Sequence, residues 1–465
     1  MKKRLFSLMV ALMLALPMAC AEQPPQGQPP EGMPGQPPEG GMPGQPPEGG
    51  MPGGPGGMPG GGSEDFEYAA AVEIKEADTR ADEVYASETA DESALMIDTD
   101  AEVTVTNPTV TKTGDSNGGD NCNFYGLNAA VLAMGGATVT IQGGTIESSA
   151  SGANGVFSYG GNGGRNGAEG DGTTVYISDT TITTTGSGSG GIMTTGGGVT
   201  YAYDLTVTTS GQSSAPIRTD RGGGTVYVDG GSYTSNGLGS PAIYSTAAID
   251  VKNATLVSNL SEGVCIEGMN SITLTDCDLT ANNTKCNGNA TFLDSIMIYQ
   301  SMSGDADSGN SSFTMTGGSL TSQSGHIFHV TNTNAIITLS GVTLLNEDPE
   351  NVLISVCDDG WSGASNTATL NASAQVMNGD ILVGDNSALT LNLSDGSKLE
   401  GSVSGQIANS RGETVSTEVG QVTVTLDDTS TWTLTADTSI TAFNGSLENV
   451  NTNGFTLYVN GEAVA

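Results

Sequence analysis

The sequence predicts an all-β solenoid in which short parallel strands repeat along one thin core. Three segments align without gaps and end at asparagines spaced 23 positions apart: GTVYVDGGSYTSN (224–236), AAIDVKNATLVSN (247–259) and NSITLTDCDLTAN (270–282). Each has two apolar residues one position apart, then a turn residue, then a third apolar residue. A fixed period of this length is typical of solenoids. Composition agrees, because 68 Gly and 5% aromatic residues do not suit a core of large side chains.

The same pattern runs from residue 101 to residue 440. Its first apolar position falls at Val103, Val139, Val175, Thr200, Val226, Ile249, Ile272, Phe313, Ile337, Ala368, Leu389 and Val422. The turn position carries residues that tolerate positive φ, namely Gly143, Asp179, Asp204, Gly230, Asn253, Asp276, Gly317 and Gly341. A second apolar stretch precedes the first in most repeats, so two or three strands are expected in each. We therefore expect about 12 rungs, stacked ~4.8 Å apart.

This pattern resembles the right-handed parallel β-helix fold of pectin-lyase-like enzymes, phage tailspikes and autotransporter passenger domains. Asn236, Asn259 and Asn282 are similar to the asparagine ladder at one corner of that fold, in which stacked amides bond from rung to rung. The resemblance covers roughly residues 95–440 and implies a single-stranded solenoid with a cap at each end. Thr- and Gly-rich runs such as ATVTIQGGTIESS (137–149) are closest to surface adhesins and passenger domains. The fold hosts unrelated activities, so the resemblance names none of them.

The first 21 residues have the features of a secretory signal peptide. A basic start, MKKR, precedes a short apolar run and a small-residue cleavage site. Two processing routes fit: cleavage at the Ala19–Ala21 site would release a soluble protein, whereas Cys20 could become a lipid-modified N-terminal cysteine. Either route predicts a secreted protein or one on a bacterial cell surface.

Low-complexity sequence and two caps complete the predicted domain organisation. Residues 22–63 repeat QPPEGGMPG and near-copies of it, which predicts a disordered Pro/Gly-rich stalk without a core. Residues 64–100 are acidic and Ala-rich, and we expect them to cap the first open edge of the solenoid. Residues 441–465 are expected to form the C-terminal cap.

Charge and cysteine usage exclude several classes of function. The formal net charge is −38, so a nucleic-acid partner is not expected, because phosphate binding needs a Lys/Arg surface. Membrane contact is expected only through a lipid on Cys20. The other five cysteines are scattered and contain no C-x-x-C pair, so zinc-site spacing is absent.

No catalytic residues are assigned from the sequence. Lyases of the family it resembles hold Ca²⁺ with carboxylates and use an Arg or Lys as the base. The only compact mixture of charges here is Arg218-Thr-Asp220-Arg221, which we interpret as a corner salt bridge. His326 and His329 are expected on opposite faces of a strand, which argues against a shared histidine site.

Two candidate binding sites remain. Tyr176, Tyr201 and Tyr227 occupy the outward position of three consecutive repeats and predict a ladder ~4.8 Å apart. Exposed rings in a row suit sugar faces, although a self-stacked ladder would only stabilise a sheet. Asp305 and Asp307 resemble the front half of a Ca²⁺ loop, with a solvated acidic loop as the alternative. No other cofactor is expected.

These observations lead to one functional hypothesis and one alternative. We expect a non-catalytic, adhesin-like binding or structural module that recognises a polysaccharide, or another ligand on a host or neighbouring cell surface. The insertions at 282–310 and 346–366, the latter carrying Trp361, are the usual kind of place for recognition. The alternative is a polysaccharide lyase or hydrolase of the pectin-lyase-like fold.

Overall fold

The computed structural model describes residues 67–465, except 164–168, 302 and 362–364. The predicted signal peptide, Cys20 and the whole of the predicted stalk therefore lie outside the described residues. The described chain is all-β, and its helices are α1 (Asn121–Phe124) and the 3-10 helix η1 (Leu447–Asn449). No helix in these ranges is long and apolar enough to span a membrane.

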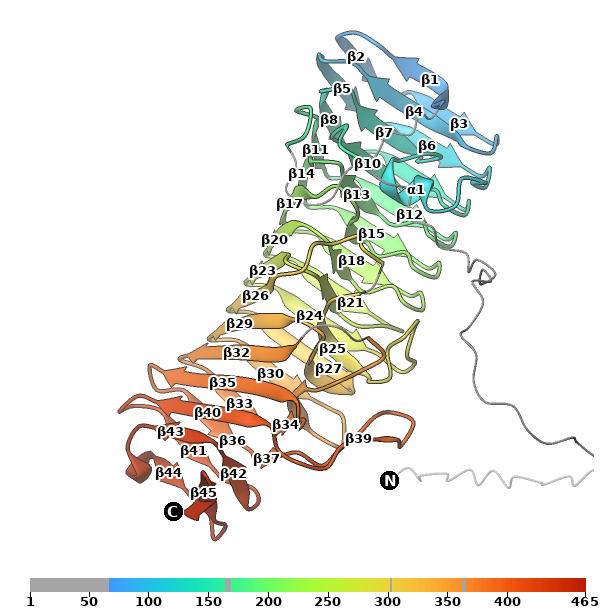
Figure 1. The fold of residues 1–465 in the computed structure, drawn as a ribbon. Helices are drawn as coiled ribbons and strands as arrows, with labels where there is room; N and C mark the ends of the chain where they lie inside the picture. Colours follow the sequence, from blue (N-terminus) through green and yellow to red (C-terminus); the bar gives the residue numbers. More distant parts are fainter. Residues whose placement is uncertain (1–66, 164–168, 302, 362–364) are drawn as a thin grey trace, which may run out of the picture. The chain divides into compact units, whose positions relative to one another are not determined.

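Three long parallel sheets contain most of the strands, and each sheet takes every third strand along most of the chain (Figure 1). The first sheet has 13 strands: β1 (Ala69–Ile74), β4 (Glu92–Asp98), β7 (Val131–Met134), β10 (Val156–Tyr159), β13 (Ile192–Thr195), β16 (Ile217–Thr219), β19 (Ile243–Ser245), β22 (Val264–Glu267), β25 (Asp294–Tyr299), β28 (His326–Thr331), β31 (Val352–Val356), β34 (Asp380–Val383) and β37 (Val403–Ser404). The second has 14: β2 (Asp78–Ala81), β5 (Glu102–Thr106), β8 (Thr138–Gln142), β11 (Thr174–Ser178), β14 (Gly198–Tyr203), β17 (Gly224–Asp229), β20 (Ala248–Lys252), β23 (Ser271–Thr275), β26 (Asn310–Thr316), β29 (Asn334–Ser340), β32 (Asn366–Ser373), β35 (Ser387–Ser394), β40 (Gln421–Leu426) and β43 (Ala442–Asn444). The third has ten: β3 (Val84–Ser87), β6 (Thr109–Lys112), β9 (Thr145–Ser148), β12 (Thr181–Thr184), β15 (Thr206–Thr209), β18 (Ser232–Ser235), β21 (Thr255–Ser258), β24 (Asp278–Asn282), β27 (Ser319–Ser324) and β30 (Thr343–Asn346).

Smaller sheets follow toward the C-terminus. One is parallel and contains β33 (Val376–Asn378), β36 (Lys398–Glu400), β41 (Thr431–Thr433) and β44 (Val450–Asn451). The others are the antiparallel pair β38 (Ile407–Ala408) and β39 (Thr414–Ser416), and the sheet of β42 (Thr438–Ile440), β45 (Leu457–Val459) and β46 (Glu462–Ala463). Stacked parallel sheets that take strands in rotation are compatible with a β-helix solenoid.

The repeat positions aligned from the sequence are partners in the second sheet. Val226 pairs with Ile249, and Ile249 pairs with Ile272. The same register runs from Val103 to Ile337 and again from Ala368 to Val422. Between these two runs the alignment is wrong by two residues, because Ile337 pairs with Leu370 and Ala368 pairs with Ala335. The eight predicted turn residues all have positive φ, between 50° for Asp204 and 78° for Gly230. A residue at this corner must turn the chain sharply, which Gly, Asn and Asp do at the lowest cost.

The main core lies between the three sheets and runs through the repeats. In the second sheet every other residue is buried, as the alternation of a half-exposed strand requires. The first sheet differs, because strands such as β22 and β31 are buried at every position. Val264 and Ile266 face the main core, whereas Cys265 packs outward against loop residues in a separate cluster. Insertions therefore cover the outer face of the first sheet, which places loop side chains close to strand side chains.

The segments expected as caps also contain strands of the long sheets. Within residues 64–100, strands β1 to β4 pair in register with the strands that follow them. Within residues 441–465, β43 pairs with β40 of the second sheet.

Candidate ligand-binding groove

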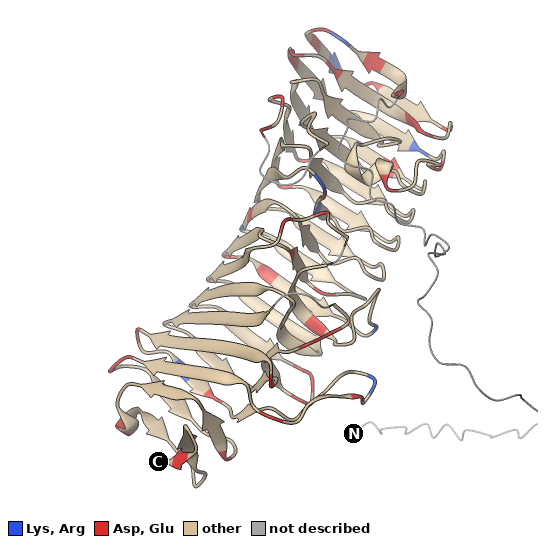
Figure 2. Cartoon of the chain, in the orientation of Figure 1, with Lys and Arg blue, Asp and Glu red and all other residues tan. Residues whose placement is uncertain are grey.

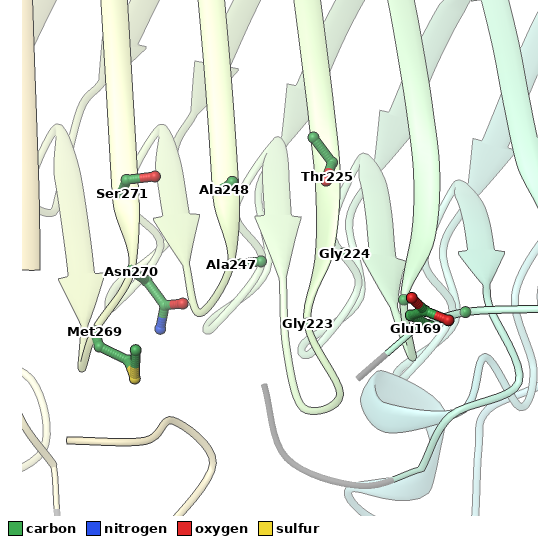
Figure 3. Close-up of a pocket in the computed structure, with 11 residues that line it drawn as sticks. Glu169, Gly223, Gly224, Thr225, Ala247, Ala248, Met269, Asn270 and Ser271 are labelled. Carbon is green, nitrogen blue, oxygen red and sulfur yellow. The ribbon is translucent and has the colours of Figure 1, made fainter. Parts of the chain in front are cut away.

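A groove of about 430 Å³ crosses four successive turns between the first and second sheets. Figure 3 shows these turns side by side, with Met269 and Asn270 toward one end and Glu169 at the other. Between them lie the small residues Gly223, Gly224, Thr225, Ala247 and Ala248, and Ser271 follows Asn270 at the first end. The groove exists because these turns carry almost no side chains.

Backbone geometry keeps the groove open. Gly223 and Gly224 have φ values of 69° and 147°, which L side chains rarely adopt. The insertion before β11 packs directly on the corresponding turn of the next repeat, since a Cβ at Gly170 would collide with the carbonyl oxygen of Gly197. Met269 is 52% exposed at the other end and contacts Gly309 of a second insertion. The groove is therefore bounded by one insertion at each of its two ends.

The tyrosine ladder lies on the same face as the groove. Thr225 lines the groove on β17, and Tyr227 points to the same side because it is two residues further along the strand. Tyr176, Tyr201 and Tyr227 are register partners, and their ring centroids are 4.9 Å apart in each pair. The ladder expected from the sequence is therefore present, and it continues the groove along the second sheet.

The rings present their edges and hydroxyls to solvent, because their faces cover one another. The interplanar angles are 7° and 12°, and Tyr176 and Tyr227 are each 39% exposed. Burial, followed by the neighbouring tyrosines, raises the pKa of Tyr201, so its hydroxyl remains a hydrogen-bond donor at neutral pH. Asp250 is the register partner of Tyr227 and adds a carboxylate to the row. This surface offers hydrogen bonds along its length and an open ring face only at its ends.

The predicted asparagine ladder is formed at one step. The amide Nδ2 of Asn259 donates to Oδ1 of Asn236 at 2.8 Å. Asn282 lies where the register shifts between β24 and β27, and its Oδ1 accepts from Ser324 at 3.5 Å. The insertion that follows Asn282 accounts for the interruption.

Asp305 and Asp307, the residues of the predicted calcium loop, both make contacts within the protein. Oδ1 of Asp305 accepts two hydrogen bonds from Arg221, at 2.6 Å and 3.2 Å. The carbonyl oxygen of Asp307 accepts from the backbone N–H of Met269. Among the described residues, no three His, Cys, Asp or Glu side chains gather as metal ligands. The two aspartates help to fix the insertion against the turns that line the groove.

Charged residues converge on the outer face of the first sheet in a way that sequence reasoning missed. The expected pair of Arg218 and Asp220 is present at 2.8 Å, and burial raises the pKa of Asp220 to about 6 although Arg218 opposes the shift. Arg221 also lies 4.1 Å from the ring centre of Phe124. Its acidic partner Asp305 is 84 residues away in sequence, so no local pattern reveals it. These charges neutralise one another, which leaves neither arginine positioned as a free base.

The prediction that the two histidines lie on opposite faces is wrong. Nδ1 of His326 and Nδ1 of His329 both lie 2.7 Å from Oγ of Ser355. Strict alternation fails at the start of β28, where Ile327 and Phe328 both pack in the main core.

The histidines belong to a closed network with one carboxylate. Nε2 of His329 lies 3.3 Å from Oδ2 of Asp359, and the ring of Phe292 stacks on His329. Burial, followed by the charge of His329, lowers the pKa of His326 to about 3, so its imidazole is neutral. Ser355 and His329 are fully buried. The serine, histidine and aspartate therefore cannot reach a substrate in this conformation.

A scan against protein-family models finds no match, and searches of curated proteins and of solved structures find none either.

Proposed function

We propose that this protein is an extracellular, adhesin-like binding module that holds an extended glycan chain without cleaving it. The observation that carries the proposal is the groove across four turns, continued on the same face by the tyrosine ladder. An extended chain lying across successive rungs would meet an open turn at each step and tyrosine hydroxyls on three neighbouring strands. This is the geometry that a repeating polymer requires.

The chemistry of this face favours polar, uncharged or cationic sugars. Tyrosine hydroxyls, the Asp250 carboxylate and the Ser271 hydroxyl can all bond to sugar hydroxyls. Asp and Glu number 51 against 13 Lys and Arg, and Figure 2 shows acidic residues spread over the described chain. A field of this sign repels acidic polymers. The proposed ligand is therefore unlike the acidic polysaccharides of the lyases that the sequence resembles.

The proposed setting is the bacterial cell surface. We propose that the three sheets wind as one right-handed, pectin-lyase-like β-helix, each strand of the second sheet marking a rung. The order of every third strand supports this, and crossovers between parallel strands are almost always right-handed. The signal at 1–21 would export the chain, and the stalk at 22–63 would hold the solenoid away from the membrane, tethered through Cys20 or released.

Affinity electrophoresis tests the proposal. The full secreted protein is run in gels cast with neutral, cationic and acidic polysaccharides. We expect retardation by at least one neutral or cationic polymer, and loss of it in Ala248→Arg, which places a long side chain in the groove from an exposed position. Val376→Arg is the matched control, because Val376 is 65% exposed and does not line the groove.

Unretarded migration in every gel would overturn the proposal, as would equal retardation of the two arginine variants and the wild type. Incubation with each retained polymer tests the alternative of a lyase or hydrolase. New reducing ends or unsaturated products would show cleavage and contradict a non-catalytic role.

A further inference from the structure

A second cavity, of about 310 Å³, lies over the outer face of the first sheet. Its floor is apolar, formed by Cys265 of β22 and Met297 of β25, which are 6% and 3% exposed. Three aromatic side chains line it, Tyr244, Tyr299 and Trp361. Cavities that enclose a small ligand typically have this mixture of apolar walls and few polar groups.

The two tyrosines are fixed by one carboxylate. The hydroxyls of Tyr244 and Tyr299 both donate to Oε2 of Glu267, at 2.5 Å and 3.2 Å. Its other oxygen accepts from the hydroxyls of Ser301 and Ser303. Burial, followed by the charge of Glu267, raises the pKa of both tyrosines well above its ordinary value, so both remain protonated donors. Because both tyrosine hydroxyls donate to Glu267, a ligand in the cavity would contact the tyrosine rings and not their hydroxyl protons.

The loop that carries Trp361 is anchored to the neighbouring insertion. Oδ1 of Asp359 accepts from the backbone N–H and the hydroxyl of Thr291, at 2.8 Å and 2.6 Å. A Cβ at Gly360 would collide with the carbonyl oxygen of Asn289, so the two loops are in direct backbone contact. The rings of Trp361 and Tyr299 then meet at a centroid distance of 4.9 Å. The third aromatic wall is therefore held in place rather than loosely exposed.

Two buried glutamates lie at the cavity. Glu262 lines it and is 5% exposed, and Glu267 lies behind the two tyrosines. No Lys or Arg is among the described residues that line it. Arg218 lies 5.7 Å from the ring centre of Tyr244, but its charge is paired with Asp220.

We propose that this cavity binds an organic ammonium cation of the choline type. Three aromatic rings and buried carboxylates attract a diffuse positive charge, while the apolar floor suits its methyl groups. A sugar fits less well, because the tyrosine hydroxyls and Glu267 already bond to one another. The inference is independent of glycan binding in the groove.

Choline titration of the full protein tests the proposal. Intrinsic fluorescence reports on Trp361, since the other tryptophan, Trp432, is fully buried and bonded to the carbonyl oxygen of Gly401. We expect saturable 1:1 binding of choline, and at least about tenfold weaker binding of the uncharged isostere 3,3-dimethylbutan-1-ol. Calorimetry should show that Trp361→Ala abolishes choline binding.

A charge-specific variant keeps the test sharp. Glu262→Gln preserves shape, and we expect it to weaken choline binding roughly tenfold while leaving 3,3-dimethylbutan-1-ol unchanged. Tyr227→Ala, on the groove face, is the control and should bind choline as the wild type does. Equal affinity for choline and the alcohol would overturn the proposal, as would no saturable choline binding or no effect of Trp361→Ala.

Discussion

The stacking of the tyrosine ladder makes a quantitative prediction about its middle member. Tyr201 stacks on two neighbours, whereas Tyr176 and Tyr227 each have one tyrosine neighbour within the ladder. Each aromatic pair contributes about 0.5–1.5 kcal/mol beyond area burial. Replacing Tyr201 by Thr should therefore reduce the free energy of unfolding by about 1–3 kcal/mol, and the same change at either end by about half as much. Thr is the suitable substitute, because it favours strands and Thr140 already occupies this row beside Tyr176.

Urea unfolding measures this difference. The three single variants are compared with the wild type by transition midpoint, at a slope shown to be unchanged. The double variant Tyr176→Thr/Tyr227→Thr should cost about as much as Tyr201→Thr alone, since each removes both stacking contacts. Equal losses at all three positions would refute the stacking account. Polysaccharide gels on the same variants then separate stability from binding: a ladder that only stabilises the sheet leaves retardation unchanged.

Three further predictions concern stability and metal binding. Burial raises the pKa of Asp294 well above its ordinary value of 3.8, so the native state retains the proton and the free energy of unfolding should fall as pH rises from 3.8 toward the raised pKa. Asp294→Asn should flatten that dependence in urea titrations across this range, and an unchanged slope would contradict the assignment. Gly224→Ala should cost about 1–3 kcal/mol, because φ is 147° there, and an unchanged melting temperature would be the contrary result. Ca²⁺ or a chelator should leave the melting temperature unchanged, because Asp305 is bonded to Arg221, and a rise with Ca²⁺ would show a site.

The second sheet is the part of the fold that sequence reasoning predicts best. Its strands expose one face, so apolar residues recur at every second position and their spacing defines the register. Asp179, Asn253 and Gly230 mark the corners because positive φ restricts the residue type. The tyrosine ladder follows directly, since equivalent positions of parallel strands stack.

The first sheet is harder to predict because both of its faces are buried. Every position of β28 is buried, its two histidines included, so the sequence does not show which side chain faces outward. The misplaced histidines follow from this. Contacts made by the insertions are also invisible, as in the pair of Arg221 and Asp305. One feature of the sequence could have revealed the groove, namely the Gly and Ala residues at successive turns. These residues indicate a surface with few side chains only once the turns have been aligned with one another.

The binding of a glycan chain in the groove is tested most directly by mapping which backbone amides a bound polysaccharide protects. Hydrogen exchange of the backbone amides is compared with and without the polymer that retards the protein in gels. Binding in the groove predicts slower exchange at the four turns that line it, at 196–199, 222–225, 246–249 and 268–271, and at the tyrosine strands β11, β14 and β17. Protection confined to the third sheet, or to the insertion at 283–293, would contradict it and place the ligand elsewhere.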